Sequence, residues 1–412
     1  MDSIEEPERS ATTDGRSELG LGRVVGVGAA VQGTAVLPMF LIGALGVQIQ
    51  SDLGLSASQL GSLTGIFIAS RMVFSASLGG LVDRFGGIRS MRASAIGCGL
   101  VSLSVAMFAT SWLALVISMV FGGMVQAGSQ PAANRFILRY VPSGRLGLAF
   151  GIKQSGAPVA TVFAGLSVPL LALTVGWRWG FGIGAVLALA TLFAIPRRSQ
   201  DARSRSKAGV RTKVKPGLAL AAVGFSFILA AINSMGTFIV VSGVAAGIDP
   251  GVAGLLLSAG GLLAILVRVV VGILADRRGQ DHFRFVALQI LIGAVCYALL
   301  SLAVPWLYVL ATLVAYATIW SFQGVFFMAV VQHDLAAPAA ATGRVISIGS
   351  IGGFSGAPVF GYVADIFGFG VAWRMTAVWA VLGAIAVGLA ARRQAEERRA
   401  SAPQEVAHVG DR

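Results

Sequence analysis

Long apolar runs separated by short polar connections make up most of this 412-residue chain. Each run is close to the roughly 20 residues that an α-helix needs to cross the hydrocarbon core of a bilayer. About twelve such runs can be distinguished, and they begin near Val24, Leu60, Met91, Trp112, Leu146, Trp179, Gly217, Gly251, Phe283, Trp306, Val345 and Val371. The pattern predicts an all-α polytopic membrane protein with twelve transmembrane helices.

One connection is longer than the others and divides the runs six and six. Between Pro196 and Pro216 the chain reads PRRSQDARSRSKAGVRTKVKP, a basic stretch without apolar periodicity, which is typical of a linker. The first residues lack the basic start and apolar core of a cleavable signal peptide. We therefore expect an N-terminal tail (1–22), a six-helix bundle (23–196), a linker (197–216), a second six-helix bundle (217–392) and a C-terminal tail (393–412).

The distribution of charged residues predicts the orientation of the chain in the membrane. Only 12% of the residues are charged, and 31 Lys and Arg against 18 Asp and Glu give a net charge of +13. Most of the basic residues fall in the tails, the linker and alternate connections, whereas the opposite connections contain only Arg178 and Arg374. This asymmetry is typical of the positive-inside rule. It predicts cytoplasmic tails and linker, a lipid bilayer as surroundings, and no nucleic-acid partner. Arg outnumbers Lys by 27 to 4, which favours a bacterial chain and so a bacterial inner membrane.

The two halves of the chain look like copies of one unit. Several short motifs recur at similar offsets: LVDRFGG at 81–87 and ILADRRG at 273–279, SGAP at 155–158 and at 355–358, and Trp177-Arg178 and Trp373-Arg374. Because six is an even number, each copy enters the membrane from the same side, which is the arrangement of parallel repeats. The sequence thus predicts two pseudo-symmetric six-helix bundles.

The first of these motifs, with its second copy, carries a family resemblance. Over residues 20 to 392 the chain resembles the major facilitator superfamily of secondary transporters. The family's signature between spans two and three is matched by Gly79, Asp83, Arg84, Gly86 and Arg89, and in the second copy by Gly272, Asp276, Arg277 and Gly279. Gly87 and Gln280 stand where a basic residue usually follows the last Gly. The resemblance implies alternating access and a gating role for these loops; a solvated turn that fixes topology is the alternative.

Three basic residues lie inside predicted spans, namely Arg71, Lys153 and Arg268. A charge there costs at least a few kcal/mol, so each is a candidate for function. At 1.5 Å per residue, Arg71 and Arg268 lie about 18 and 12 Å from the cytoplasmic ends of their helices, on the same face of equivalent helices. We expect them to converge on one site. Alternatively, Arg268 bonds to backbone carbonyls among small residues, and Lys153 reaches back to the cytoplasmic surface.

Acidic residues give the complementary signal, because none of the 18 Asp and Glu falls in the middle of a predicted span. A carrier of organic cations normally presents a buried carboxylate to its substrate. Buried cations instead favour an anionic substrate, a small carboxylate or inorganic oxyanion, held by Arg71 and Arg268 with help from Lys153. Cotransport of a proton, or exchange for another anion, needs no titrating carboxylate.

Resemblance favours the same substrate class. A basic residue eight positions before the Asp of span eight, as Arg268 is, is similar to the anion-binding Arg of monocarboxylate, oxalate and nitrate transporters. Ser75 stands where a nitrate porter would place its partner Arg, which favours a carboxylate. The rival within transport is multidrug or neutral-solute efflux, because SGAP loosely resembles the Gly-Pro signature of drug antiporters. Val159 to Phe163, however, contain no Gly.

The resemblance implies that spans one, four, seven and ten line the cavity, so polar residues on them would complete the site. Interhelical bonding or core packing is the alternative for each. The candidates are Gln32, Thr34, Gln126, Asn233, Tyr316, Trp320 and Gln323. Cys98 and Cys296 lie in apolar runs without metal-type spacing, and no catalytic triad or nucleotide loop is recognisable. We expect a monomeric carrier with no cofactor, no metal and no catalytic residues.

Overall fold

The computed structural model describes residues 20–142, 145–197, 216–277, 282–333 and 338–401, and all regular secondary structure within them is helical. The first bundle contains α1 (Leu21–Ala44), α2 (Gly46–Leu53), α3 (Ala57–Phe85), α4 (Gly87–Phe108), α5 (Trp112–Tyr140), α6 (Leu146–Gln154), α7 (Gly156–Ser167), the π-helix η2 (Val168–Ala172) and α8 (Arg178–Ala194). The second contains α9 (Pro216–Ala245), α10 (Pro250–Arg277), α11 (His282–Leu300), α12 (Pro305–Thr318), α13 (Gln323–His333), α14 (Pro338–Phe367) and α15 (Phe369–Ser401).

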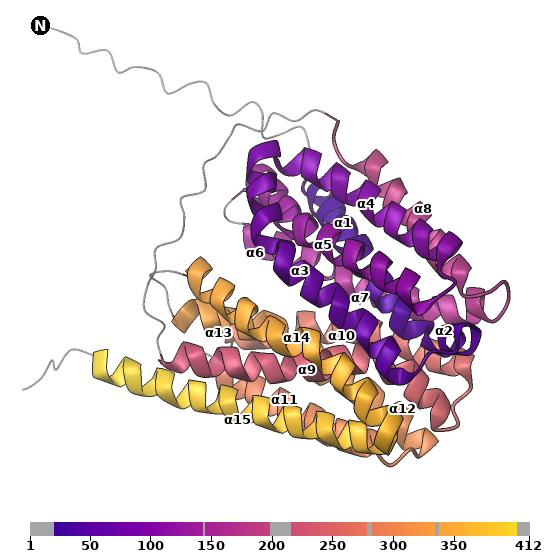
Figure 1. The fold of residues 1–412 in the computed structure, drawn as a ribbon. Helices are drawn as coiled ribbons and strands as arrows, with labels where there is room; N and C mark the ends of the chain where they lie inside the picture. The colour runs from indigo at the N-terminus through magenta and orange to yellow at the C-terminus, as the bar shows by residue number, and fades with distance from the viewer. Residues whose placement is uncertain (1–19, 143–144, 198–215, 278–281, 334–337, 402–412) are drawn as a thin grey trace, which may run out of the picture.

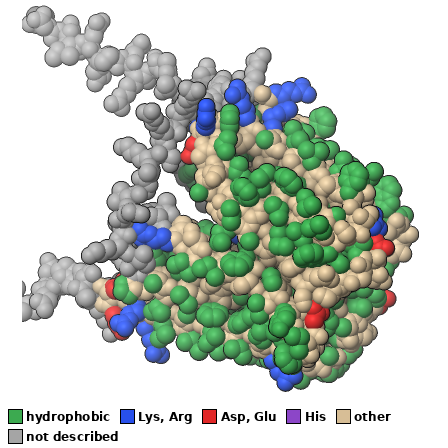
Figure 2. All heavy atoms as spheres, in the orientation of Figure 1, with side chains coloured by type: hydrophobic (Ala, Val, Ile, Leu, Met, Phe, Trp, Pro, Cys, Tyr) green, Lys and Arg blue, Asp and Glu red, His purple; other side chains and the backbone are tan. Residues whose placement is uncertain are grey.

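The predicted fold class is confirmed. Eleven segments of the described chain are long and apolar enough to cross a membrane, and the shorter apolar helix α8 is the twelfth span. Figure 1 shows α1 to α8 gathered in one group and α9 to α15 in another beside it. Apolar side chains cover much of the face in Figure 2, and large ones such as Phe108, Phe193 and Trp306 are strongly exposed. Such a surface suits contact with lipid rather than water.

Two spans that the sequence predicts as continuous runs are interrupted. The fifth span breaks between α6 and α7 and continues into η2, and the tenth breaks between α12 and α13. Pro158 explains part of the first break, because it has no N–H to donate to the carbonyl of Gln154, four residues earlier. Backbone groups freed inside a membrane need another partner. Both breaks therefore leave backbone carbonyls that can accept hydrogen bonds from side chains.

The two bundles pack tightly at one end, where α3 and α10 begin and α14 ends; we call this the closed end. Gly61 of α3 lies against the carbonyl of Ala357 on α14, and Gly43 of α1 lies against the backbone of Gly236 on α9. A Cβ at either glycine would collide with that backbone, so small residues permit the close approach. At the opposite, terminal end, where α1 begins and α15 ends, the groups diverge (Figure 1), and Figure 2 shows the surface hollowed between them.

The last helix is longer than expected. The sequence places the end of the second bundle at residue 392, but α15 continues to Ser401. Its extension carries alternating charges, and Arg393 Nη1 lies 3.2 Å from Glu396 Oε2 one turn later. Pairs of this spacing stabilise an exposed helix modestly. The other predicted boundary, the linker at 197–216, lies almost entirely outside the described residues and stays a prediction.

An ion pair fixes the rim of the first bundle at the closed end. Asp52 Oδ2 accepts hydrogen bonds from Trp177 Nε1 at 3.1 Å and Arg178 Nη1 at 2.8 Å, and Arg178 also donates to the carbonyl of Ala109. The indole and guanidinium donors hold the pKa of Asp52 below its ordinary value. The second bundle differs, because Arg374 donates to Gly370 of its own helix.

Asp52 is expected to contribute to acid stability. With its folded pKa depressed, its contribution is present above the ordinary Asp pKa of about 3.9 and is lost as the pH falls through the folded value. Asp52→Asn should remove that part of the pH dependence, by less than about 1 kcal/mol because the pair is exposed. Melting temperatures of both proteins between pH 3 and pH 7 would test this. Curves that stay parallel over that range would contradict it.

Candidate functional site

Arg268 links both broken helices. Its Nη1 donates to the carbonyl of Gln154 at the end of α6, at 3.3 Å, and its Nη2 donates to the carbonyl of Trp320 in the break after α12, at 2.9 Å. The first acceptor is the one that Pro158 leaves free. Arg268 thus joins α10 to the fifth span of the first bundle and to the tenth span of its own bundle. The interpretation in which Arg268 bonds backbone carbonyls is confirmed.

The Arg268 guanidinium has N–H groups that these two bonds do not use. Arginine has five N–H groups, and the two bonds use one on each terminal nitrogen. Its Nε is buried and has no hydrogen-bond partner in the described structure. A buried donor without a partner is costly, which makes it a point where a ligand gains affinity. A structural role and an anion-binding role are therefore compatible at this residue.

Arg71 is half-buried on α3, and no residue of the described structure pairs with it. Thr64 and Ile68 precede it by seven and three positions and lie on the same helix face. Thr64 accepts a hydrogen bond from Thr237 of α9, and Ile68 lies near Gly353 of α14. That face of α3 is thus turned toward the second bundle, and it carries Arg71 about 10 Å from Thr64 toward the terminal end.

A layer of side chains separates this region from the closed end. It surrounds a small cavity of about 10 Å³, room for about one water, lined by Met39, Phe40, Thr64, Ile232, Asn233, Gly236, Thr237 and Trp320. The Phe40 and Trp320 rings lie 5.9 Å apart, across the two bundles. Because the carbonyl of Trp320 accepts from Arg268, this layer forms a floor directly beside that guanidinium.

Lys153 has a different environment from the two arginines. Its side chain is only 2% exposed, and its Nζ donates to Asn134 Oδ1 of α5 at 2.8 Å. Its Cγ faces Gly28 of α1. The alternative in which Lys153 reaches the surface is wrong, because the side chain is enclosed by helices of the first bundle. Its role toward a substrate stays a prediction.

The predicted polar residues divide into two groups. Asn233 and Trp320 line the small cavity, whereas Tyr316 is fully buried with its ring against Gly260 of α10. Side-chain atoms of Gln32, Gln126, Tyr316 and Trp320 are buried without a hydrogen-bond partner in the described structure. Thr34 bonds the carbonyl of Ala30 in its own helix, and Gln323 is half-buried at the start of α13. The structure therefore brings only some of them to the floor.

Acidic residues are absent from the middle of the described spans. Asp52, Asp83, Asp249 and Asp365 all lie at helix ends or in connections. Asp365 was not among the predicted site residues, yet it bonds across the bundles at the closed end: its carboxylate accepts from the backbone N–H groups of Ala57 and Ser58, both at 2.8 Å. No local sequence pattern signals such a contact between distant segments.

The first copy of the gating motif is a folded turn. Arg135 of α5 lies 3.0 Å from Asp83 and also donates to its carbonyl, so the described partner of Asp83 belongs to the same bundle. Gly86 has φ of 89°, a conformation that favours glycine, and Gly87 lies against the backbone of Ala132. That close approach is a physical reason for Gly87 at this position.

Other motif residues are less informative. A Cβ at Gly79 would have open space around it, Arg84 lies 5.9 Å from the Phe85 ring, and Arg89 is exposed. In the second copy, Gly279 lies outside the described residues, as do the surroundings of Gly272 and the side chains of Asp276 and Arg277. A gating role for both copies stays a prediction.

The family model described as Major Facilitator Superfamily matches residues 28–354, most of the chain. The chain belongs to the Major Facilitator Superfamily. It is therefore a multi-pass membrane transporter and not an enzyme. A solved structure titled as a bacterial homolog to the human lysosomal transporter Spinster, inward-facing and unoccupied, superposes with a TM-score of 0.74. It covers 92% of this chain and 99% of that one at 16% identity, which shows a shared fold.

Curated members of the superfamily resemble parts of the chain. Multidrug resistance protein MdtG of Escherichia coli O17:K52:H18 (strain UMN026) is 29% identical over 291 residues, covering 66% of this chain and 67% of that protein. The hexuronate transporter of Bacillus subtilis (strain 168) is 25% identical over 174 residues, covering 41% of this chain and 40% of that protein. The chain thus aligns with about two thirds of the first protein's length and less than half of the second's.

Proposed function

We propose that this transporter carries a small organic anion, a carboxylate, by alternating access. One observation carries the proposal: Arg71 and Arg268 offer guanidinium donors without partners near mid-depth, while the described spans contain no carboxylate there. Planar guanidinium groups match the geometry of a carboxylate. Hexuronates, named in one relative, are themselves carboxylates.

The site faces the terminal end. The floor formed by Phe40, Thr64 and Trp320 closes it from the other side, and both arginines lie on the terminal side of that floor. We infer from the distribution of basic residues that the terminal end is cytoplasmic and that both tails lie inside; the membrane would be a bacterial inner membrane. The described arrangement then corresponds to access from the cytoplasm. A monomer carrying the anion with a proton, or exchanging it for another anion, fits these features.

Efflux of drugs is the second candidate. The resemblance to multidrug resistance protein MdtG covers more of the chain than that to the hexuronate transporter. Phe40 and Trp320 would present aromatic surface to a lipophilic compound. The two candidates differ in the charge of the ligand, because buried arginines repel lipophilic cations and attract carboxylates.

Thermal unfolding of the purified protein would separate them. Aliphatic and aromatic carboxylates, nitrate, sugars and lipophilic cations are added in turn, and a ligand at 100 times its Kd should add about 2.7 kcal/mol of stability. A carboxylate is expected to stabilise the wild type and not Arg71→Gln. Arg374→Gln, the same change at an exposed position of α15, should respond as the wild type. Stabilisation by cations or sugars alone would overturn the anion site.

A further inference from the structure

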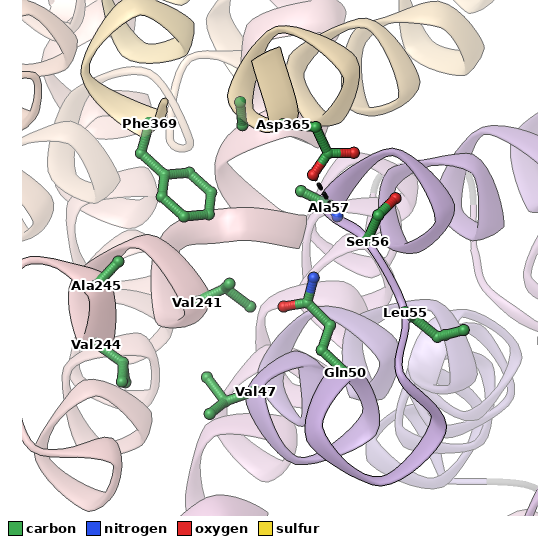
Figure 3. Close-up of a pocket in the computed structure, with 11 residues that line it drawn as sticks. Val47, Gln50, Leu55, Ser56, Ala57, Val241, Val244, Ala245, Asp365 and Phe369 are labelled. Carbon is green, nitrogen blue, oxygen red and sulfur yellow. Dashed lines mark hydrogen bonds between the residues drawn. The ribbon is translucent and has the colours of Figure 1, made fainter. Parts of the chain in front are cut away.

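A second pocket lies at the closed end, away from the arginines. It has a volume of about 410 Å³ and is lined by Val47, Gln50, Leu55, Ser56, Ala57, Val241, Val244, Ala245, Ala364, Asp365 and Phe369. These residues come from α2, the connection after it, the start of α3, α9, α14 and α15, so both bundles form its walls. Figure 3 shows the Gln50 amide and the Phe369 ring directed toward the space between them.

The size and lining of the pocket suit a small organic molecule. Ligand pockets typically measure about 300–1,000 Å³ and combine apolar walls with a few polar groups. Here Val47, Val241 and Phe369 supply apolar surface, while Gln50 and Asp365 supply the polar atoms. Asp365 is the one ionisable residue in the lining. The pocket therefore has a defined charge preference.

The carboxylate of Asp365 is exposed and has no cationic partner among the described residues. It accepts from Ala57 N on one oxygen, and from Ser58 N and Ser58 Oγ on the other. The Ser56 side chain is a further hydrogen-bond donor to this carboxylate, so the donors at the start of α3 occupy about as many lone pairs as a carboxylate offers. Its negative charge stays exposed at the pocket wall, without a cation beside it in the described structure.

We propose that this pocket binds a small organic cation. An apolar body would pack against the walls while an ammonium group lies beside the exposed carboxylate of Asp365 as its counter-ion. Because the walls belong to both bundles, an occupant would hold the closed end together and oppose its opening. This site is separate from the proposed anion site, and neither depends on the other.

Tryptamine is a suitable probe, with tryptophol as a matched neutral compound in which a hydroxyl replaces the ammonium group. Equilibrium dialysis on the purified protein should show tryptamine binding about tenfold more tightly than tryptophol, a difference of about 1.4 kcal/mol. Asp365→Asn should bring the ratio close to one. Asp249→Asn, a closed-end aspartate that accepts from Gly251 and Val252 of its own helix, should leave it unchanged.

A second variant tests the pocket without touching the charge. Ala245 is an exposed lining residue, so Ala245→Trp fills the space from its rim and should weaken both compounds about tenfold or more. Equal binding of tryptamine and tryptophol to the wild type, no binding of tryptamine at millimolar concentration, or tryptamine binding unaffected by Asp365→Asn and Ala245→Trp would each overturn the proposal.

A distance measurement tests whether an occupant of the pocket holds the closed end together. Spin labels at the exposed positions Thr110 and Leu302, one in each bundle, report the distance across the closed end. Tryptamine should shift the distribution toward the shorter distances. Binding to the pocket that leaves this distribution unchanged would overturn the proposed effect on opening.

Discussion

Arg268→Gln is expected to abolish carboxylate binding and to destabilise the folded protein by about 2–6 kcal/mol. The change removes the donors to the carbonyls of Gln154 and Trp320. Neither acceptor regains a backbone donor easily, because Pro158 has no N–H and Trp320 lies in a helix break. Each carbonyl left unpaired costs about 1–3 kcal/mol. Thermal unfolding with and without the stabilising carboxylate measures both effects.

Arg71→Gln is the matched control for the structural part. Arg71 has no partner among the described residues, so its loss should change the free energy of unfolding by less than about 0.5 kcal/mol. It should nevertheless remove the response to the carboxylate. If both variants lose the response to the carboxylate but only Arg268→Gln is strongly destabilised, ligand binding is distinguished from the structural role of Arg268. An Arg268→Gln protein as stable as the wild type would contradict the bridging role.

Arg268→Lys refines the expectation. Lysine keeps the charge but concentrates it on one ammonium group, which does not reproduce the planar fork that reaches two carbonyls. We expect most of the stability loss of Arg268→Gln and partial retention of carboxylate binding, as a Kd raised roughly tenfold, or about 1.4 kcal/mol. Full recovery of stability in Arg268→Lys would show that charge alone, and not the bidentate geometry, supports the helix breaks.

Sequence patterns predicted the parts of this molecule that depend on local composition. Apolar run length located the twelve spans, and repeated motifs such as SGAP predicted two bundles. The cost of burying charge singled out Arg71 and Arg268. Pro158 could also have predicted an acceptor without a backbone donor, because a proline inside a span leaves the carbonyl four residues earlier unpaired. In the structure, Arg268 donates to that carbonyl, which belongs to Gln154.

Contacts between distant segments were beyond such patterns. Asp365 looks like any polar residue at a span end, and its partners at Ala57 and Ser58 lie some three hundred positions away. Lys153 seemed able to reach the surface, but the packing of α1 and α5 around α6 encloses it. In both cases the outcome depends on how helices pack, which periodicity within one helix does not encode.

Asp365→Ala is expected to open the closed end. The carboxylate crosses from α14 to the first turn of α3, where it accepts from two backbone N–H groups at 2.8 Å. Ser56 and Gln59 also form a reciprocal capping box at the start of α3, so the helix itself should persist without Asp365. The cost of the substitution therefore falls on the contact between the bundles. Losing about 1–2 kcal/mol there would raise the open population roughly 5- to 30-fold.

Distances between spin labels at Thr110 and Leu302 would measure that population. Asp249→Ala is the matched control, because Asp249 also accepts from two backbone N–H groups at a helix start, but only from its own helix α10. It should lower stability without lengthening the distances across the closed end. Asp365→Asn, which keeps one oxygen acceptor, should fall between Asp365→Ala and the wild type. If Asp365→Ala and Asp249→Ala shift the distances equally, the carboxylate caps a helix but does not hold the bundles together.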